Sequence, residues 1–446
     1  MGFKKLHGVH VPHRKNTKDM AAVRMNCPAS VTIPMAMHIG APAKPIVKAG
    51  DRVQVGQLIA EAGGFVSSPI HASVSGVVKK IDDILSSNGR RTQTIVIEAD
   101  GLQTPYEGLC PPEVNSLESF LKAVSDSGIV GLGGAGFPTA VKLNVKDLSK
   151  IEAVIVNGAE CEPYITSDTR TMLDNSDLVM DGARLLREYL QAKRIIFGIE
   201  SNKASCISLF KKLTANETGM EVQSLPSMYP QGGEKVLIYH TIGRVVPEGK
   251  LPLDAGAIVI NCTTLAAIAR YIKTGMPLVE KCLTVDGSAV KTPQNVIVPI
   301  GTAMQDVFDF CGGFSCEPAK VLYGGPMMGI AVPDLNQPIM KNTNAILAMN
   351  REDALPPEPT ACIRCGRCVR HCPLKLMPTD IETAFELDRV DSLIELKVNL
   401  CMECGCCSYI CPARRPLVQT NKLAKAKVIA YLNAQKEQKE KEAAKV

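Results

Sequence analysis

Eight of the 17 cysteines in this 446-residue chain fall into two copies of one spacing near the C-terminus. The first copy runs from Cys362 to Cys372 and the second from Cys401 to Cys411, and each reads C-x2-C-x2-C-x3-C-P. This spacing is typical of bacterial iron–sulfur proteins, in which the fourth cysteine of each run binds the other cluster. Three thiolates on one tight loop can reach three irons of a cubane, so each run needs a fourth ligand from the other run.

The crossed pattern predicts two [4Fe-4S] clusters and their ligands. Cluster 1 is expected to use Cys362, Cys365, Cys368 and Cys411, and cluster 2 to use Cys401, Cys404, Cys407 and Cys372. Cys406 is out of register and is expected to be a neighbour rather than a ligand, and His371 is expected to lie beside a cluster as a structural residue. Zinc, which typically uses paired C-x2-C motifs, and disulfides, which need an oxidising compartment, fit this pattern less well.

The whole composition is that of an ordinary soluble globular protein, with 46% hydrophobic and 21% charged residues. A net charge of only +5, no Trp and 4% aromatic residues argue against nucleic-acid binding. No apolar run approaches the roughly 18–20 residues that span a bilayer, and no apolar segment follows Met1–Lys5 as in a signal peptide. We therefore expect a chain made and kept in the reducing cytosol, which would meet a membrane only at its surface.

The first hundred residues divide into an expected N-terminal tail, residues 1–30, and a β domain, residues 31–100. The β domain has short alternating strands separated by glycine turns. It resembles the flattened barrel of biotinyl and lipoyl carrier domains, which carry a modifiable lysine on one hairpin. Here that hairpin is Ala62–Val66 and has no lysine, so we expect a docking or packing role for a barrel-sandwich domain.

Residues 117–275 alternate between helical segments and buried strands, which predicts a Rossmann-like α/β domain. A G-x-G-x-x-G loop, Gly131–Gly136, precedes a helical stretch that contains Lys142. Such loops point backbone N–H groups at phosphate, and Lys142 could reach an anionic group. Two further loops, Asn157–Glu162 and Gly232–Glu234, are expected at the same edge of the sheet, where open α/β sheets bind ligands.

The rest of the chain contains a small module, a linker, the cysteine runs and a tail. Residues 281–330 predict a strand–helix–strand module, and the proline-rich stretch 351–361 predicts a linker. The cysteine-run domain covers residues 362–420, with helices expected between the two runs. Residues 421–446 predict a charged helical tail that is solvated, or disordered until a partner covers it.

The segments Gly131-Leu-Gly-Gly-Ala-Gly-Phe-Pro-Thr-Ala-Val-Lys142 and Val156-Asn-Gly-Ala-Glu-Cys-Glu-Pro-Tyr164 resemble the flavin- and NADH-binding subunit of respiratory complex I. The chain is more similar to the RnfC subunit of the Rnf ion-translocating electron-transport complexes. The resemblance covers nearly the whole chain. It implies a carrier-like barrel, an FMN-binding α/β domain, a ligand-binding β-grasp module over 281–330 and a helical dicluster ferredoxin domain, in that order.

The resemblance also implies the residues that contact FMN and NAD(H). By position these are Gly131, Gly133, Gly134, Gly136, Lys142, Asn157, Glu160, Glu162, Gly232, Glu234, Asn261 and Thr264. The chain departs from the complex I pattern at Leu132, where an arginine is expected, and at Ala159, where an aspartate is expected.

A flavin and two iron–sulfur clusters on one chain would convert between paired and single electrons, because nicotinamides exchange hydrides and clusters exchange single electrons. The resemblance implies a peripheral subunit, on the cytoplasmic side of the cell membrane, of an ion-translocating ferredoxin:NAD+ oxidoreductase. Its partners would be integral-membrane and iron–sulfur subunits, with ferredoxin reached indirectly. Two alternatives remain. One is a soluble flavin/iron–sulfur reductase, such as a cobalamin reductase. The other is a scaffold that carries electrons through its clusters without a flavin, if Leu132 and Ala159 have abolished flavin binding.

Overall fold

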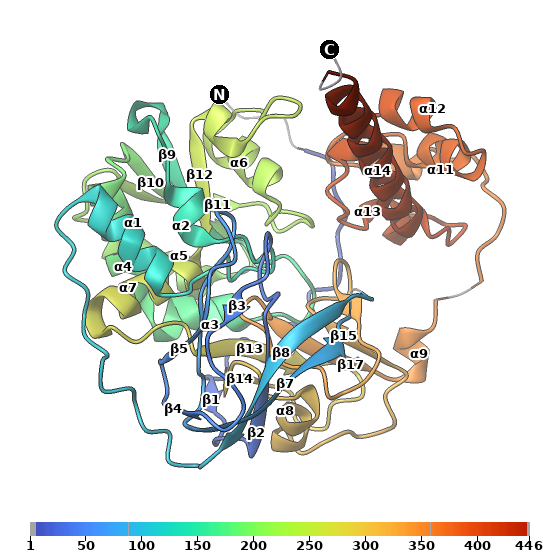
Figure 1. Ribbon diagram of the computed structural model, residues 1–446. Helices are drawn as coiled ribbons and strands as arrows, with labels where there is room; N and C mark the ends of the chain where they lie inside the picture. Colours follow the sequence, from blue (N-terminus) through green and yellow to red (C-terminus); the bar gives the residue numbers. More distant parts are fainter. Residues whose placement is uncertain (1–5, 88, 357, 444–446) are drawn as a thin grey trace.

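The computed structural model of the chain describes residues 6–87, 89–356 and 358–443 (Figure 1). A barrel-sandwich domain and a mixed β-sheet domain lie together, an α/β domain packs against both, and a helical domain follows a long connection. This multidomain arrangement confirms the predicted fold class. Within the described part of the chain, no helix is long and apolar enough to cross a membrane.

The barrel-sandwich domain consists of two antiparallel sheets. One has the order β2 (Ser30–Pro34), β8 (Arg91–Ala99), β7 (Gly76–Leu85) and β4 (Arg52–Val53), and the other β3 (Lys44–Pro45), β5 (Leu58–Glu61) and β6 (Ile70–His71). Alternate strand residues point inward, and the side chains of Ile33, Ile59 and Ile95 are fully buried between the sheets. The hairpin that lacks a lysine ends in an exposed Phe65.

The α/β domain is built on a parallel sheet of order β11 (Met220–Leu225), β10 (Arg194–Glu200), β9 (Ala153–Gly158) and β12 (Ala257–Asn261). Its helices are α1 (Leu117–Asp126), α2 (Thr139–Leu143), α3 (Ser167–Asp174), α4 (Ser176–Tyr189), α5 (Ala204–Leu213), α6 (Glu234–Ile242) and α7 (Cys262–Thr274). Short 3-10 turns lie at Leu148–Lys150 and Pro252–Ala255.

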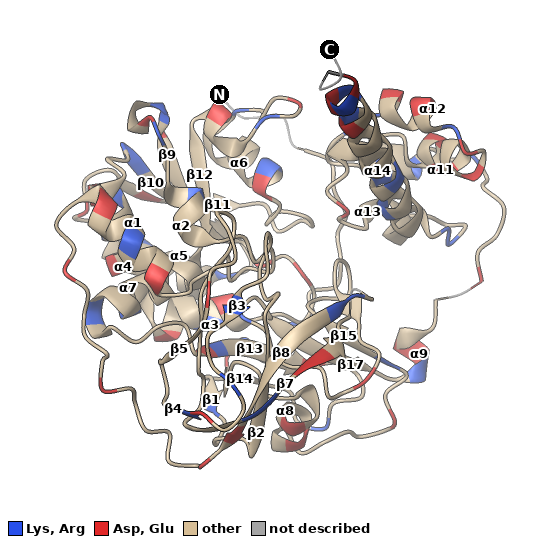
Figure 2. Cartoon of the chain, viewed as in Figure 1, with Lys and Arg blue, Asp and Glu red and all other residues tan. Residues whose placement is uncertain are grey.

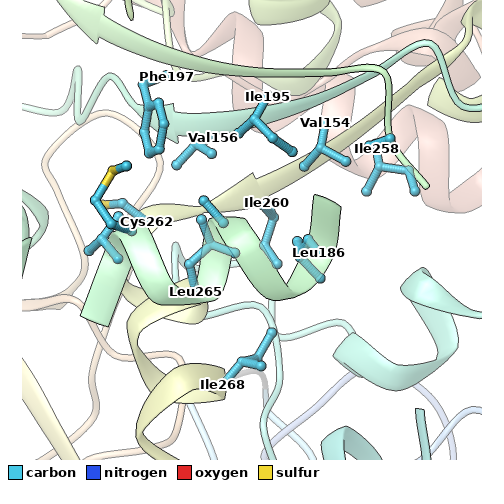
Figure 3. Close-up of a cluster of buried hydrophobic side chains, with 14 of the residues drawn as sticks. Val154, Val156, Leu186, Ile195, Phe197, Ile258, Ile260, Cys262, Leu265 and Ile268 are labelled. Atoms are coloured by element: carbon cyan, nitrogen blue, oxygen red, sulfur yellow. The ribbon is translucent and has the colours of Figure 1, made fainter. Parts of the chain in front are cut away.

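Both faces of this sheet are covered by helices, which explains its continuous apolar strands. On one face, Val154 and Val156 pack with Leu265 of α7 and Leu186 of α4, as Figure 3 shows. On the other face, Ile155 packs against residues of α6. The carboxyl ends of the strands are thereby held at one edge, where the predicted loops emerge.

The mixed sheet is larger than the predicted module 281–330. Its order is β1 (Val23–Arg24), β14 (Gln294–Pro299), β13 (Glu280–Asp286), β17 (Ala345–Met349), β15 (Lys320–Tyr323) and β16 (Ile330–Ala331), with helix α8 (Met304–Phe310). β1 comes from the N-terminal segment and β17 from beyond residue 330. Pairing between segments so far apart in sequence leaves no local signal in the chain, and a sequence pattern cannot reveal it.

The helical domain follows the short helix α9 (Arg351–Ala354). It contains α10 (Arg367–Arg370), α11 (Pro378–Glu386), α12 (Val390–Glu395), a 3-10 turn at Val398–Leu400, α13 (Cys406–Tyr409) and α14 (Leu417–Ala443). The predicted charged tail is helical, but its first turns belong to this domain, because Ala424 and Val428 are buried against the helices between the runs. The later turns carry exposed Lys and Glu, visible as alternating colours in Figure 2.

The segment predicted as an N-terminal tail is packed into the molecule. Residues 1–5 lie outside the described residues, and from there the chain runs between the α/β and helical domains (Figure 1). Val9 exchanges backbone hydrogen bonds with Tyr229, at 2.8 and 3.0 Å. The structure therefore differs from the expected tail, because this segment is ordered by partners more than a hundred residues away.

Candidate cofactor sites

The sheet order of the α/β domain reverses between β9 and β12, and ligands bind at the carboxyl edge of such a switch point. The glycine loop lies at this edge. Gly133 sits against Asn261 at the start of α7, where a Cβ on Gly133 would come within 2.9 Å of the Asn261 amide nitrogen. The backbone N–H of Leu132 donates to the Thr264 hydroxyl at 3.0 Å. Four predicted site residues therefore meet where the fold favours a ligand: Gly131, Gly133, Asn261 and Thr264.

The glycine loop is closed at its base and open at its tip. Gly131 donates to Phe137 O at 2.8 Å and Gly136 donates to Gly131 O at 3.0 Å. Gly134 (φ 113°) and Gly136 (φ 65°) adopt backbone conformations that favour glycine. The tip, Gly133–Ala135, is exposed, and its three N–H groups donate to no acceptor within the described part of the chain. Successive free N–H groups form a concave donor set for an anion, which fits the phosphate of FMN.

Asn157 ties two of the predicted loops together. Its amide nitrogen donates to Gly232 O at 3.0 Å, and its amide oxygen accepts the N–H of Ala159 at 3.1 Å. Asn261 plays a similar part at α7, where its oxygen accepts the N–H groups of Thr263 and Thr264 as an N-cap. Both asparagines therefore fix the backbone of the loops that surround the candidate flavin site.

Lys142 and Glu234 form an ion pair at the same edge. The Lys142 ammonium lies 2.9 Å from Glu234 Oε1 and 2.8 Å from Val259 O. Both side chains remain more than a third exposed, at 34% and 40%. An exposed pair of this kind contributes little to stability, and its ammonium stays within reach of a ligand that enters from solvent.

Glu160 is turned inward. Its carboxylate accepts hydrogen bonds from the N–H of Asp168 at 2.7 Å and from the hydroxyl of Thr169 at 2.6 Å, at the start of α3. Burial of the carboxylate raises the pKa of Glu160, with the nearby Lys15 acting against this shift. In this structure Glu160 thus anchors the loop after β9 to α3.

Two lysines that the sequence did not single out, the partly buried Lys15 and the buried Lys203, hold the same loop. The Lys15 ammonium donates to the carbonyls of Glu160 and Glu162, both at 2.8 Å, and to Ile165 O. Lys203 donates to Ala159 O and pairs with Glu200 at 3.0 Å. Burial lowers the pKa of Lys15, whereas at Lys203 the carboxylates of Glu200 and Glu160 outweigh burial and raise the pKa.

Glu162 links the candidate flavin site to the β15–β16 turn. Its carboxylate accepts the N–H groups of Met327 at 3.0 Å and Met328 at 2.9 Å, and burial raises its pKa to about 7. The same turn touches the second cysteine run, since a Cβ on Gly405 would lie 3.0 Å from Met327 O. Glu162 therefore lies between the candidate flavin site and the second cysteine run.

The predicted ligands of cluster 2 surround one small cavity. Cys372 comes from the first run and Cys401, Cys404 and Cys407 from the second, and all four line this cavity. Burial and then the thiolates of Cys404, Cys401 and Cys372 raise the pKa of Cys407. Within the described residues, no three His, Cys, Asp or Glu side chains converge closely enough to hold a single metal ion. The cysteines enclose a space, as the ligands of a cubane must.

Backbone N–H groups point at the ligand sulfurs. The N–H of Leu376 lies 3.3 Å from Cys372 Sγ, and the N–H of Glu403 lies 3.4 Å from Cys401 Sγ. In the first run, the N–H of Arg364 lies 3.4 Å from Cys362 Sγ. These donors favour thiolate over thiol, as cluster ligation requires.

The two runs repeat one backbone path. Matching positions of the runs are left-handed, with positive φ in each pair: Arg364 and Glu403, Gly366 and Gly405, Lys375 and Arg414. Each run also continues into a one-turn helix, α10 or α13. Cys406 lies on α13, where it also lines the cluster 2 cavity, and its thiol lies 3.9 Å from Tyr229 O of the α/β domain.

The two predicted clusters differ in exposure. Cys362 and Cys365 are exposed, whereas Cys401, Cys404 and Cys407 are buried. Cys368 contributes a buried thiol to the first set, and Cys411 of the second run packs in the same small cluster of side chains. The cluster 1 ligands therefore face outward, and the cluster 2 ligands face the interior.

The cluster 2 loop touches the candidate flavin loops directly. The hydroxyl of Tyr229 donates to Cys404 O at 2.7 Å. Met402 lies against Gly233, where a Cβ would come within 2.3 Å of the methionine methyl group. Val9 of the N-terminal segment packs with Tyr229 and Cys404 in one buried group. The predicted ligands of cluster 2 therefore lie beside the candidate flavin loops.

A large cavity of about 820 Å³ lies behind the glycine loop, between the N-terminal segment, α3, α7 and β13. Leu132 lines it, but none of the predicted flavin residues does. The candidate flavin site is therefore the open edge of the sheet in front of the loop. Leu132 (1% exposed) and Ala159 (0%) are both buried, so neither departure from the complex I pattern fills the space over the loop tip.

Comparison with known protein families identifies four segments. Residues 3–102 match the RnfC barrel sandwich hybrid domain and residues 124–270 the Nuo51 FMN-binding domain. Residues 283–331 match the SLBB domain and residues 357–412 the 4Fe-4S dicluster domain. These matches agree in kind and order with the predicted domains.

Several curated proteins are similar over nearly the full length. The C subunit of the Na(+)-translocating ferredoxin:NAD(+) oxidoreductase complex of Acetobacterium woodii is 44% identical, over 95% of this chain and 96% of that protein. The C subunit of the proton-translocating complex of Clostridium ljungdahlii is also 44% identical, over 83% and 82%. Among solved structures, a chain of NAD+-reducing [NiFe]-hydrogenase has the same fold at a TM-score of 0.50 and 18% identity, over 71% of this chain and 61% of that one.

Proposed function

Because the chain belongs to the RnfC family, the C subunits of ion-translocating ferredoxin:NAD(+) oxidoreductase complexes, we propose that it performs the electron exchange of such a subunit. It passes electrons between NAD(H), FMN and two [4Fe-4S] clusters within a multi-subunit, ion-translocating complex. The two relatives at 44% identity are named for different ions, sodium and protons. The proposal therefore names no ion.

The observation that carries this proposal is the contact between the cluster 2 loop and the flavin loops. FMN can exchange electrons with a nicotinamide in pairs and with a cluster singly. Tyr229 joins the two loops through its hydrogen bond to Cys404 O. This contact supports a two-electron site and a one-electron site side by side, which is the arrangement that such a conversion requires.

The individual residues have distinct proposed roles. The free N–H groups of Gly133–Ala135 would hold the phosphate of FMN, and the ammonium of Lys142 would add a positive charge. Asn157, Asn261 and Thr264 would keep the surrounding loops in place. The eight cysteines would hold the clusters as two crossed sets. In these assignments, Glu160 has a structural role, because it anchors the loop after β9 to the start of α3.

We place the protein at the cytoplasmic surface of the membrane, attached through other subunits. NAD(H) and reduced ferredoxin are produced inside the cell, which supports this side. The exposed ligands Cys362 and Cys365 support a partner contact at cluster 1, because an electron must leave through a cluster that another redox centre can approach.

The test is removal from the membrane and return. Washing membranes with salt or chaotrope is expected to release the chain with its NADH–dye reductase activity intact. The stripped membranes should lose ferredoxin-linked NAD+ reduction and its ion transport, and both should return when the purified protein is added. A chain that is wholly soluble in cells, and whose deletion leaves membrane-linked NAD+ reduction unchanged, would support a soluble reductase instead.

A further inference from the structure

The glycine loop is held by hydrogen bonds from parts of the chain outside the α/β domain. The side-chain amide of Asn342 donates to Gly134 O at 2.7 Å. The backbone N–H of Ile39, in the barrel-sandwich domain, donates to Gly136 O at 3.0 Å. Two carbonyls of the loop, one of them within the exposed tip, are therefore bound by two other domains.

Asn342 is itself firmly placed, on a tight turn of the β16–β17 connection. Thr343 closes this turn: its N–H donates to Met340 O and its hydroxyl accepts the N–H of Met340, both at 3.1 Å. The preceding residue, Lys341, is completely buried and donates to Pro69 O at 2.6 Å and to Gly128 O at 2.7 Å. Lys341 thus joins the turn to the barrel and to the segment that leads into the glycine loop.

The bond to Gly134 O determines the direction of a neighbouring N–H. A trans peptide is planar, so the carbonyl of Gly134 and the N–H of Ala135, which belong to one peptide unit, point in opposite directions. Since Asn342 holds the carbonyl, the N–H of Ala135 points away from Asn342, and it donates to no acceptor among the described residues. The opposite orientation of this peptide would change ψ of Gly134 together with φ of Ala135, and Gly134 places no Cβ in the way of that rotation. That orientation would turn a carbonyl oxygen toward a bound phosphate.

We propose that Asn342 is a positioning residue for the phosphate of the flavin, acting through the Gly134–Ala135 peptide. This inference rests on the proposed function, because it takes the loop to bind FMN. It gives the β16–β17 connection a specific task, which is to select the anion-binding form of a loop in another domain. Asn342 contacts the loop backbone and has no need to touch the flavin itself.

The test compares FMN with riboflavin, which has the same ring and lacks the phosphate. In the cluster-containing full chain, Asn342→Ala is expected to raise the dissociation constant of FMN by about 3- to 10-fold, the range for one neutral hydrogen bond. The dissociation constant of riboflavin should stay within about twofold of wild type, because the altered peptide meets only the phosphate. Flavin fluorescence quenching measures both constants.

A second variant sharpens the test. In Asn342→Asp, the new carboxylate cannot donate to Gly134 O and would instead accept the N–H of Ala135, which favours the wrong peptide orientation. The loss of FMN affinity should therefore exceed that of Asn342→Ala, again without a matching loss for riboflavin. Asn336→Ala is the matched control, because Asn336 is an exposed asparagine in the same connection and its side chain makes no hydrogen bond among the described residues.

The outcomes distinguish loss of the positioning role of Asn342 from absence of flavin binding. Equal weakening of FMN and riboflavin would show a general structural role for Asn342 and overturn the inference, as would an Asn342→Ala protein that binds FMN like wild type. Failure of the wild-type chain to bind FMN at all would overturn the proposed function and the inference with it.

Discussion

Replacing Cys372 with serine should remove a cluster that belongs mainly to the other cysteine run. Cys372 lines the cavity formed with Cys401, Cys404 and Cys407, whereas the ligands of the first run lie elsewhere. The anaerobically prepared wild type should hold about eight irons, and loss of one cubane would leave about four. Cluster 1 should survive, because its predicted fourth ligand is Cys411.

The order in which FMN, cluster 2 and cluster 1 receive electrons adds a second expected result. Because the cluster 2 loop contacts Tyr229 and Gly233, we expect cluster 2 to pass electrons between the flavin and cluster 1. In Cys372→Ser, dithionite should still reduce cluster 1, while NADH should reduce almost none of it. In the mirror variant Cys411→Ser, NADH should reduce the remaining cluster 2 to about one spin per chain by electron paramagnetic resonance.

The same two variants can disprove the crossed ligand assignment and the proposed order of electron transfer. The reasoning fails if Cys372→Ser spares the cluster bound by Cys401, Cys404 and Cys407. The proposed order fails if NADH reduces the surviving cluster in Cys372→Ser and cannot do so in Cys411→Ser.

Three further predictions concern single residues. Lys142→Ala should weaken FMN retention by about tenfold or more, since a hydrogen bond to a charged group contributes about 1.5–3 kcal/mol, and unchanged FMN occupancy at sub-saturating flavin would exclude the contact. Cys406→Ser should leave the iron content and cluster spectra unchanged, because the thiol faces Tyr229 O; loss of iron would make it a ligand. Burial lowers the pKa of Lys341 to about 7, so the unfolded state binds more protons above that pH and stability should rise there. Relative to Lys341→Met, wild type should gain on the order of 2–3 kcal/mol from pH 7 to pH 9 in thermal unfolding, and parallel pH profiles would contradict this.

Local spacing in the sequence was sufficient to predict three features. The cysteine runs predicted the dicluster domain, the glycines predicted a tight loop, and the alternation of segments predicted the α/β domain. The cysteine spacing follows from the size of a cubane, and the glycines follow from the backbone conformations at Gly134 and Gly136. These are properties of short segments, which a sequence shows directly.

Other features depend on residues that meet only in the folded chain. Lys15 was assigned to a tail, yet its ammonium donates to three carbonyls of the loop after β9. Asn342 lies in a connection with no motif, and only folding brings it to Gly134. Glu160 was identified by its position, but its carboxylate faces the start of α3. Contacts between such distant residues have no periodicity along the chain, so sequence patterns cannot predict them.

The central claim is that electrons from NADH enter through FMN and leave singly through two clusters on this chain. Rapid anaerobic mixing of NADH with the purified, cofactor-replete chain tests it most directly, with flavin absorbance and freeze-quenched cluster spectra followed together. The account predicts that the flavin is reduced first, cluster 2 next and cluster 1 last. Flavin reduction that leaves both clusters oxidised, or cluster reduction that proceeds equally well in flavin-free protein, would contradict it.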